Sequence, residues 1–361
     1  MYDVVVVGGG IGGLTVAALL SARGMNVCLL ERQSQVGGCI ARVEFSGHDF
    51  EPGMGLYASF GPGGVYEKLF AQLPVDPPAA SLLASPYVMR GPDGSDAKVN
   101  EHDIYAIAGG PASLAERLAE SIKRSGGNLR LNSPVLRLSY DEAGRATGVD
   151  LLSGERVFAR KAIVSNLTAW DTYGKLVGLN RTPPEIKKNL NALRGTGAYV
   201  VYASMEESAV SRLPGERIAV EDAEGELAVA VSSSQMAPPG KRAVTFSTLT
   251  EVDSWFAYQS SEEDYEQRDQ EALEQFWNRL HKALPELGSD IEIIETANPR
   301  TYYDETRRKL GMVLGVDGTS RASSDTFLPN LFIIGDTVSF TPRLHSIVET
   351  AILLASKVLR H

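Results

Sequence analysis

A glycine-rich turn near the start of the chain restricts the fold more than any other feature. A run of valines, Val4 to Val7, leads directly into Gly8, Gly10 and Gly13, and an apolar segment of helical composition follows. In this G-x-G-x-x-G spacing the first glycine permits a tight turn, the second lets a pyrophosphate approach the backbone, and the third lets the helix pack on the strand. A continuous β-branched run predicts a strand buried on both faces. The pattern predicts an α/β unit that binds a dinucleotide.

An acidic residue at the end of the next strand supports this interpretation. We expect a helix over Ile11–Ala22, a C-cap near Gly24, and a second strand over Asn26–Leu30 that leads to Glu31. Glu31 follows the last glycine of the motif by about 20 residues, in place to accept hydrogen bonds from an adenosine ribose. NAD and FAD share this half of a dinucleotide site, so both stay open at this point.

Length and charge narrow the class of protein. The 361 residues suffice for about two domains. The formal net charge of −10 disfavours a nucleic-acid partner, because phosphate binding needs clustered lysine and arginine. Cys28 lies in an apolar run, so we expect no disulfide framework and a reducing compartment. The scattered histidines give no metal-binding spacing. The sequence shows neither a signal peptide nor an apolar run of bilayer length, so a cytoplasmic location is expected, with peripheral membrane contact as an alternative.

The segment after the second strand resembles a known superfamily. ERQSQVGGC, residues 31–39, is similar to the E-R-x(n)-G-G motif of the FAD-binding amine oxidase and phytoene desaturase superfamily. Further similar segments follow: GHDFEPGMGLY (47–57), residues 109–138, KAIVSN (161–166) and NLFIIGDTVS (330–339). The resemblance implies an α/β fold with a discontinuous, Rossmann-like FAD-binding domain and a second, α+β substrate domain built on an antiparallel sheet. The expected FAD-binding domain comprises residues 1–75, 109–170 and 305–361, and the expected substrate domain comprises 76–108 and 171–304.

The same resemblance implies which residues hold FAD. The pair Gly37–Gly38 would let the chain pass close to the pyrophosphate and ribityl, Val135 would meet the adenine through its backbone, and Asp336 would bind a ribityl hydroxyl. The helix N-terminus near Ser346 and Ile347 would present amide N–H groups to the flavin ring. The full expected set is Gly8, Gly10, Ile11, Gly12, Gly13, Glu31, Arg32, Gly37, Gly38, Cys39, Arg42, Gly53, Met54, Gly55, Leu56, Val135, Asn166, Gly335, Asp336, Ser346 and Ile347.

Cys39 favours one branch of the superfamily. Monoamine-oxidase-like members usually have arginine after the glycine pair, whereas the branch of carotenoid isomerases and retinol saturases often has cysteine or a small residue. Residues 293–315 also resemble this polyene branch, although Asn298 stands where the branch usually has threonine. The resemblance implies an FAD-dependent oxidoreductase that desaturates, saturates or isomerises C=C bonds in an apolar, isoprenoid-like molecule by hydride transfer at flavin N5. The alternatives are an oxidase of amines or other heteroatom-bearing substrates, and a flavin-binding subunit that needs a partner protein.

Two departures from the family pattern affect the expected site. Residues 103–108 run almost directly into Gly109, where phytoene desaturases and retinol saturases have a long helical insertion over the substrate channel. We therefore expect a smaller or more polar substrate, or closure of the site by a partner subunit or a second copy. In residues 339–351, bulky side chains replace the family's glycines, among them Arg343 and His345. His345 as a proton donor, Arg343 as an anion-binding group and Tyr57 as a pocket residue are the candidate catalytic side chains; a loop histidine, a surface ion pair and a packed tyrosine are the alternatives.

The remaining sequence predicts the second domain. Residues 197–206, 226–234 and 242–251 alternate and are rich in β-formers, which indicates an antiparallel sheet. Residues 260–287 predict a helix whose apolar stripe, including Leu280, packs on a core and whose acidic face is solvated.

Overall fold

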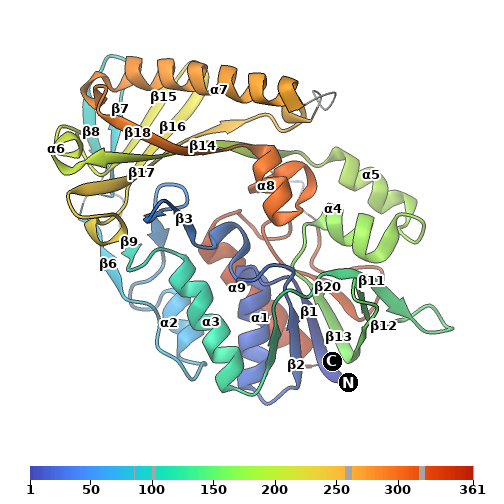
Figure 1. The fold of residues 1–361 in the computed structure, drawn as a ribbon. Helices are drawn as coiled ribbons and strands as arrows, with labels where there is room; N and C mark the ends of the chain where they lie inside the picture. Colours follow the sequence, from blue (N-terminus) through green and yellow to red (C-terminus); the bar gives the residue numbers. More distant parts are fainter. Residues whose placement is uncertain (85, 100–102, 257–261, 317–321, 361) are drawn as a thin grey trace.

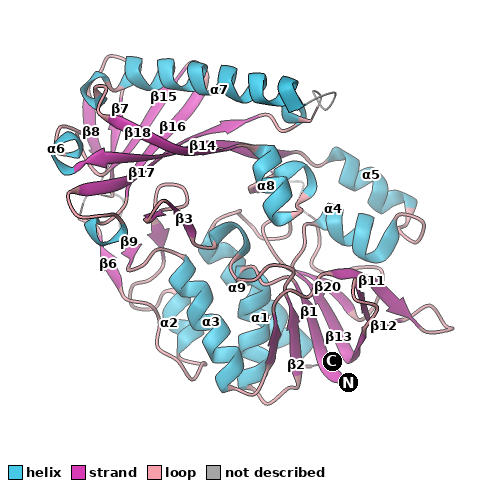
Figure 2. Cartoon of the chain, in the orientation of Figure 1, coloured by secondary structure: helices cyan, strands magenta, loops and turns pink. Residues whose placement is uncertain are grey.

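A computed structural model describes residues 1–84, 86–99, 103–256, 262–316 and 322–360. The chain forms two large β-sheets, each covered by helices (Figure 1). Figure 2 shows how the helices divide between the two sheets. The N-terminus and the C-terminus lie close together beside the first sheet.

The first sheet has seven strands in the order β10-β2-β1-β13-β12-β11, with β20 beside β13. Neighbouring strands from β10 through β13 to β20 are parallel, and β11 and β12 add an antiparallel pair to β13. The strand bounds are β1 (Tyr2–Val7), β2 (Val27–Leu30), β10 (Asn128–Arg130), β11 (Val135–Tyr140), β12 (Ala146–Leu151), β13 (Arg156–Ser165) and β20 (Leu331–Ile333).

Both faces of the first sheet are covered, as the valine run predicted. Val4 and Val6 pack against the helices α1, α2, α3 and α9, whereas Val5 and Val7 pack on the opposite side with Leu30 and the antiparallel pair. All four valines are buried. The helix bounds are α1 (Ile11–Ala22), α2 (Val65–Phe70), α3 (Ala112–Arg124), α4 (Ala169–Asp171), α5 (Pro184–Ala192) and α9 (Leu344–Val358), and a π-helix spans Thr172–Gly178.

The second sheet is the expected antiparallel sheet, with strands that the sequence pattern did not indicate. Its eight strands follow the order β18-β14-β17-β16-β15-β7-β8, with β19 beside β14. The pair β7–β15 is parallel and joins two distant parts of the chain. The strand bounds are β7 (Tyr87–Arg90), β8 (Asp96–Val99), β14 (Gly195–Glu206), β15 (Arg217–Asp222), β16 (Gly225–Val231), β17 (Lys241–Thr250), β18 (Ile291–Ala297) and β19 (Leu314–Val316).

One long helix covers the outer face of the second sheet. This helix, α7 (Glu262–Ala283), packs Phe276 and Leu280 onto Val201 and Phe246 of the sheet (Figure 1). The predicted helix of residues 260–287 therefore ends earlier, because Pro285 begins a separate 3₁₀ turn; residues 260 and 261 lie outside the described ranges. The short helices α6 (Glu207–Val210) and α8 (Pro299–Thr306) follow β14 and β18 along the chain.

The inner face of the second sheet is turned toward the first sheet, and a hairpin lies between them (Figure 1). The hairpin consists of β3 (Val43–Phe45) and β4 (His48–Phe50). A small sheet joins β5 (Tyr57–Ala58), β9 (Ile104–Ile107) and β6 (Ala80–Leu82). Because β9 ends at Ile107 and α3 begins at Ala112, residues 108–111 connect the two directly and hold no helical insertion.

The two sheets can be compared with the proposed division into two domains. β7 and β8 belong to the second sheet, as the assignment of residues 76–108 to the substrate domain requires. The pairing and packing suggest two changes to this proposed division. Because β19 pairs with β14, we propose that the second unit includes residues up to Val316. Because the π-helix and α5 pack Tyr173 and Leu190 on the first sheet, we propose that residues 171–193 group with the FAD-binding unit. Within the described residues, no helix is both long and apolar enough to span a bilayer.

Candidate functional site

The two glycine motifs meet at the carboxyl ends of β1 and β2. Gly10 and Gly37 form an isolated parallel bridge, and the Gly37 amide donates a hydrogen bond to the Gly9 carbonyl at 2.8 Å. A Cβ built on Gly38 would lie 3.6 Å from the Gly10 Cα. Gly37 has φ of +116°, a backbone conformation that residues other than glycine rarely adopt. The two motifs therefore form one backbone surface without side chains.

Steric limits show why this surface requires glycine. A Cβ on Gly10 would lie 2.5 Å from Asn166 Nδ2, and one on Gly12 would lie 2.7 Å from Asn166 Oδ1. A Cβ on Gly13 would lie 2.3 Å from the Gly8 carbonyl oxygen. Asn166, at the end of β13, accepts a hydrogen bond from the Gly13 amide at 3.0 Å and thereby fixes the N-terminus of α1. A helix N-terminus behind a side-chain-free loop favours an anionic phosphate, so these residues fit the diphosphate of a dinucleotide.

Glu31 lies at the edge of the same loop. Its carboxylate accepts hydrogen bonds from the Gly9 amide at 2.6 Å and from the Gln33 amide at 2.7 Å. The Glu31 backbone is bonded to Arg130 and Ser133, which carry the chain toward Val135. The expected ribose-binding acid and the expected adenine-side strand thus lie on one side of the glycine loop.

Asp336 follows β20 and carries a partner that the sequence patterns did not indicate. Arg308 Nη2 donates to Asp336 Oδ2 at 2.5 Å, and Arg308 Nε donates to the Met312 carbonyl at 2.6 Å. The two side chains of the ion pair are 17% and 11% exposed. Burial lowers the pKa of the Arg308 guanidinium, and the negative charge of Asp336 raises it. The net effect is a raised pKa. Of the two Asp336 oxygens, Oδ1 has no hydrogen-bond partner among the described residues and is free to accept from a ligand hydroxyl.

Cys39 faces the same region from the glycine pair. Its side chain is accessible to solvent, yet desolvation by the surrounding protein raises the pKa of its thiol. Arg308 and Asp336 both act electrostatically on the Cys39 thiol, so the ion pair lies near the glycine pair. A thiol with a raised pKa is a poor nucleophile, which agrees with its interpretation as a small wall residue.

The expected flavin-side turn, Gly53–Leu56, is tied to the second sheet. Arg217 of β15 donates to the Met54 carbonyl at 3.0 Å. Glu51, just before the turn, is 8% exposed and accepts a 2.7 Å hydrogen bond from the Tyr57 hydroxyl. Burial raises the pKa of Glu51, opposed by the hydrogen bond from Tyr57 and the charge of Arg217. Tyr57, an expected catalytic candidate, is therefore a buried partner of a carboxyl group.

This burial predicts a pH dependence that one substitution removes. The folded state holds the Glu51 proton more tightly than the unfolded chain, so stability falls as pH rises from about 4.5 through the higher folded pKa. Glu51→Gln keeps an acceptor for Tyr57 without the charge. We expect a Tm about 2 °C above wild type at pH 8, which corresponds to roughly 1 kcal/mol, and a flatter Tm profile between pH 5 and pH 8.

The control for this prediction is Glu44→Gln on the same hairpin. The Glu44 side chain is 58% exposed and lies 3.9 Å from Arg42, so its loss should leave the profile unchanged. Parallel Tm profiles for Glu51→Gln and wild type would contradict the prediction.

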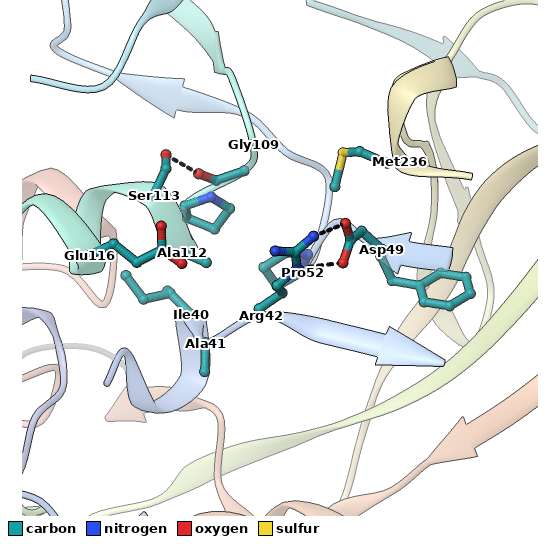
Figure 3. A pocket seen from close by; sticks show the side chains of 13 residues that line it. Ile40, Ala41, Arg42, Asp49, Pro52, Gly109, Ala112, Ser113, Glu116 and Met236 are labelled. Carbon is teal, nitrogen blue, oxygen red and sulfur yellow. Dashed lines mark hydrogen bonds and ion pairs between the residues drawn. The ribbon is translucent and has the colours of Figure 1, made fainter. Parts of the chain in front are cut away.

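A cavity of about 140 Å³ opens between the β3–β4 hairpin and the start of α3 (Figure 3). Arg42, expected to bind the cofactor, lies on its wall and makes a two-pronged ion pair with Asp49. Arg42 therefore lies on the wall of this cavity and is held there by Asp49, and its role in binding the cofactor stays a prediction. Arg32, from the same motif, donates to the Glu305 carbonyl at the end of α8. Apolar residues form most of the remaining wall: Ile40, Phe50, Pro52, Pro111, Ala112 and Met236.

The start of α9 differs in detail from the expectation. The helix begins at Leu344 with Arg343 as its N-cap, and the Ile347 amide donates to the Arg343 carbonyl at 3.1 Å. Ile347 therefore has no free amide for a flavin; the amides of the preceding turn lack intrahelical partners by helix geometry. His345 is half-buried in this turn, while Arg343 is exposed. The described hydrogen bonds do not join either side chain to Tyr57, although α9 and β5 are in contact, so the catalytic roles of the three residues stay predictions.

The comparisons with known proteins agree with this geometry. Residues 6–73 match the model of an NAD(P)-binding Rossmann-like domain, and residues 89–359 match that of flavin containing amine oxidoreductases. Chloroplastic prolycopene isomerase of Daucus carota is 27% identical over 252 residues, which cover 63% of this chain and 40% of that protein. Carotenoid 3,4-desaturase of Haloarcula japonica is 43% identical over 75 residues, 21% of this chain and 14% of that protein.

A solved structure shows the same fold over the whole chain. An oxidoreductase from Methanosarcina mazei has a TM-score of 0.74 at 15% identity, covering 98% of this chain and 99% of that one. The chain spans only two fifths of the length of the carrot protein. The expected fold class is confirmed.

Proposed function

The chain belongs to the flavin containing amine oxidoreductase family, and we propose that this FAD-dependent oxidoreductase acts on the C=C or C–C bonds of an apolar, isoprenoid-like small molecule. When bound, FAD supplies the acceptance or donation of a hydride at its N5 position. Two relatives named for polyene substrates, a prolycopene isomerase and a carotenoid desaturase, support this choice.

The observation that carries the proposal is an aromatic layer on the inner face of the second sheet. Tyr202 of β14 packs on Phe50 and Phe45 of the hairpin, with ring centroids 4.9 Å and 5.5 Å away. Ala243 and Ala297 complete the buried part of the layer. The layer joins the hairpin to the second sheet, and an apolar molecule beside it would meet few groups that need water.

Different residues of this chain would bind different parts of the cofactor. The glycine surface and Glu31 would hold the dinucleotide, and Asp336 would bind a ribityl hydroxyl. Burial raises the pKa of Tyr202 and of Tyr302 above the ordinary tyrosine value, which already leaves a hydroxyl protonated at neutral pH. They present neutral hydroxyl groups at the edge of an apolar layer and exclude water from it.

Amine oxidation is the second candidate, and one observation favours it. The hydroxyls of Tyr202 and Tyr302 are neighbours, and the amine-oxidase interpretation expects two aromatic side chains beside the flavin. Beside Cys39, Arg308 and Asp336 carry opposite charges and form an ion pair, so this position does not favour either substrate by charge; the relatives named for polyenes decide the order. We therefore place polyene chemistry first.

The test begins with the flavin spectrum of the purified protein. One sample is reduced anaerobically and another is kept oxidised; each is mixed without oxygen with a C40 polyene in detergent micelles or with a primary diamine, and the reduced sample is also mixed with oxygen. The oxidation state of the flavin is followed by absorbance, and the polyene products are separated by chromatography. We expect the number or the geometry of the double bonds in the polyene to change in the presence of the protein. The polyene incubated for the same time in buffer alone should not change.

Other outcomes identify the alternatives. Reduction of the oxidised flavin by the diamine, with no change in the polyene, would reject the proposal in favour of amine oxidation. No reaction by the protein alone, followed by reaction after a co-encoded protein is added, would indicate a flavin-binding subunit.

A further inference from the structure

Arg308 reaches the dinucleotide site from a part of the chain outside the glycine motifs. It follows α8, and its guanidinium is held on two edges, by the Met312 carbonyl through Nε and by Asp336 through Nη2. The other terminal nitrogen, Nη1, has no hydrogen-bond partner within the described residues. One edge of a nearly buried cation is therefore available to a ligand.

The backbone around Arg308 is held in an unusual conformation. Arg307 and Leu310 have φ of 55° and 52°, in the left-handed region that non-glycine residues rarely occupy. The Lys309 amide donates to Asp171 Oδ2 at 3.1 Å, and Asp171 is itself bonded to Thr168. Strained residues persist only where their surroundings determine them, so the segment presents Arg308 in one defined place.

A short series of contacts connects that place with the phosphate-binding end of α1. Asp336 directly follows Gly335, and a Cβ on Gly335 would lie 3.6 Å from Asn166 Oδ1. The same Asn166 oxygen accepts from the Gly13 amide at 3.0 Å. Asp336, Gly335 and Asn166 therefore connect Arg308 with the N-terminus of α1. The electrostatic effect of Arg308 on the Cys39 thiol sets it beside the second glycine motif as well.

A cation near the N-terminus of α1 would complement the charge of the cofactor. The diphosphate of a dinucleotide is negatively charged, and this protein carries a net charge of −10. Of the other arginines expected at the site, Arg32 donates to the Glu305 carbonyl and Arg42 pairs with Asp49; the Arg42 side chain is 55% exposed, whereas that of Arg308 is 17% exposed. We propose that Arg308 binds the FAD diphosphate through its free edge, while Asp336 holds its other edge and keeps Oδ1 for the neighbouring ribityl hydroxyl. This inference depends on FAD binding alone and is independent of the substrate.

The test measures FAD affinity of the apoprotein by quenching of flavin fluorescence, at several salt concentrations. Arg308→Met should weaken binding about tenfold to a hundredfold, because hydrogen bonds to charged groups contribute that much. Salt should weaken FAD binding less steeply in Arg308→Met than in wild type, since one phosphate–guanidinium contact is gone. Arg308→Lys keeps the charge but loses the planar fork, so an intermediate affinity is expected.

The matched control is Arg307→Met, one residue earlier. The Arg307 side chain is 50% exposed and pairs with Asp304, so its loss should leave FAD affinity unchanged. Arg308→Met with the affinity of Arg307→Met would overturn the proposal. If Arg308→Met does not fold because it leaves Asp336 buried and unpaired, Arg308→Lys decides: wild-type affinity and salt dependence in that variant would show that the guanidinium does not bind FAD.

Discussion

A Gly13→Ala variant is expected to lose FAD and to be destabilised by at least about 2–3 kcal/mol, as when a well-packed core is overfilled. The added Cβ would lie 2.3 Å from the Gly8 carbonyl oxygen, 3.0 Å from Asn166 Cβ and 3.3 Å from Val6 Cγ1. The first of these contacts is with backbone that cannot rotate away, so α1 must move off β1. The Gly13 amide then loses Asn166, and the helix N-terminus moves away from the phosphate. FAD titration should show at least a hundredfold weaker binding, and urea unfolding of the apoprotein should show the loss of stability.

Gly174→Ala is the matched control, because a Cβ there would meet no atom within 4 Å and its φ is ordinary. Alanine restricts the unfolded chain more than glycine, so this variant should be as stable as wild type or slightly more. A Gly13→Ala variant that keeps its yellow colour and its urea midpoint would show that α1 is packed differently from this structure.

Local patterns were enough to predict two neighbouring strands of the first sheet, β1 and β2, and the helix between them. Helix α1 spans the predicted residues Ile11–Ala22, and the strand predicted at Asn26–Leu30 begins one residue later. These bounds are set by glycines and by a continuous apolar run, which are both visible in sequence. In the second sheet, the sequence predicted β14, β16 and β17 but not the other strands. The β8 sequence Asp96–Val99 is mostly exposed and has no apolar alternation, and β15 pairs with β7 across more than a hundred residues. Edge strands and distant pairings leave little local pattern.

The candidate site divides in the same way. The meeting of Gly10 with Gly37 was predicted, because both positions had to approach one diphosphate. Arg308 was missed, since two adjacent arginines give no sign of which one is buried; the left-handed turn at Arg307 decides it. The Glu51–Tyr57 pair was missed because Glu51 is buried by the distant residues Ser232 and Thr245, which bond its backbone.

Glu31→Ala is expected to give the second large effect, because the Glu31 carboxylate has two roles. It accepts from the Gly9 and Gln33 amides at 2.6 Å and 2.7 Å, and it is the group proposed to bind the adenosine ribose. Alanine leaves both partly buried amides without their acceptor and the ribose hydroxyls unpaired, at about 1–3 kcal/mol for each group that finds no water. We expect FAD binding to weaken at least thirtyfold, roughly 2 kcal/mol, and the apoprotein Tm to fall as well.

Two comparisons separate these roles of Glu31. Glu31→Gln keeps one acceptor oxygen, so it should recover much of the apoprotein Tm while binding FAD more weakly than wild type, because a neutral amide accepts less strongly than a carboxylate. Glu155→Ala removes an exposed carboxylate that pairs with Arg130 nearby, and it should change FAD affinity by less than about threefold. If Glu31→Ala lowers the Tm but binds FAD as well as Glu155→Ala does, Glu31 only holds the glycine loop, and the ribose must be bound by another group.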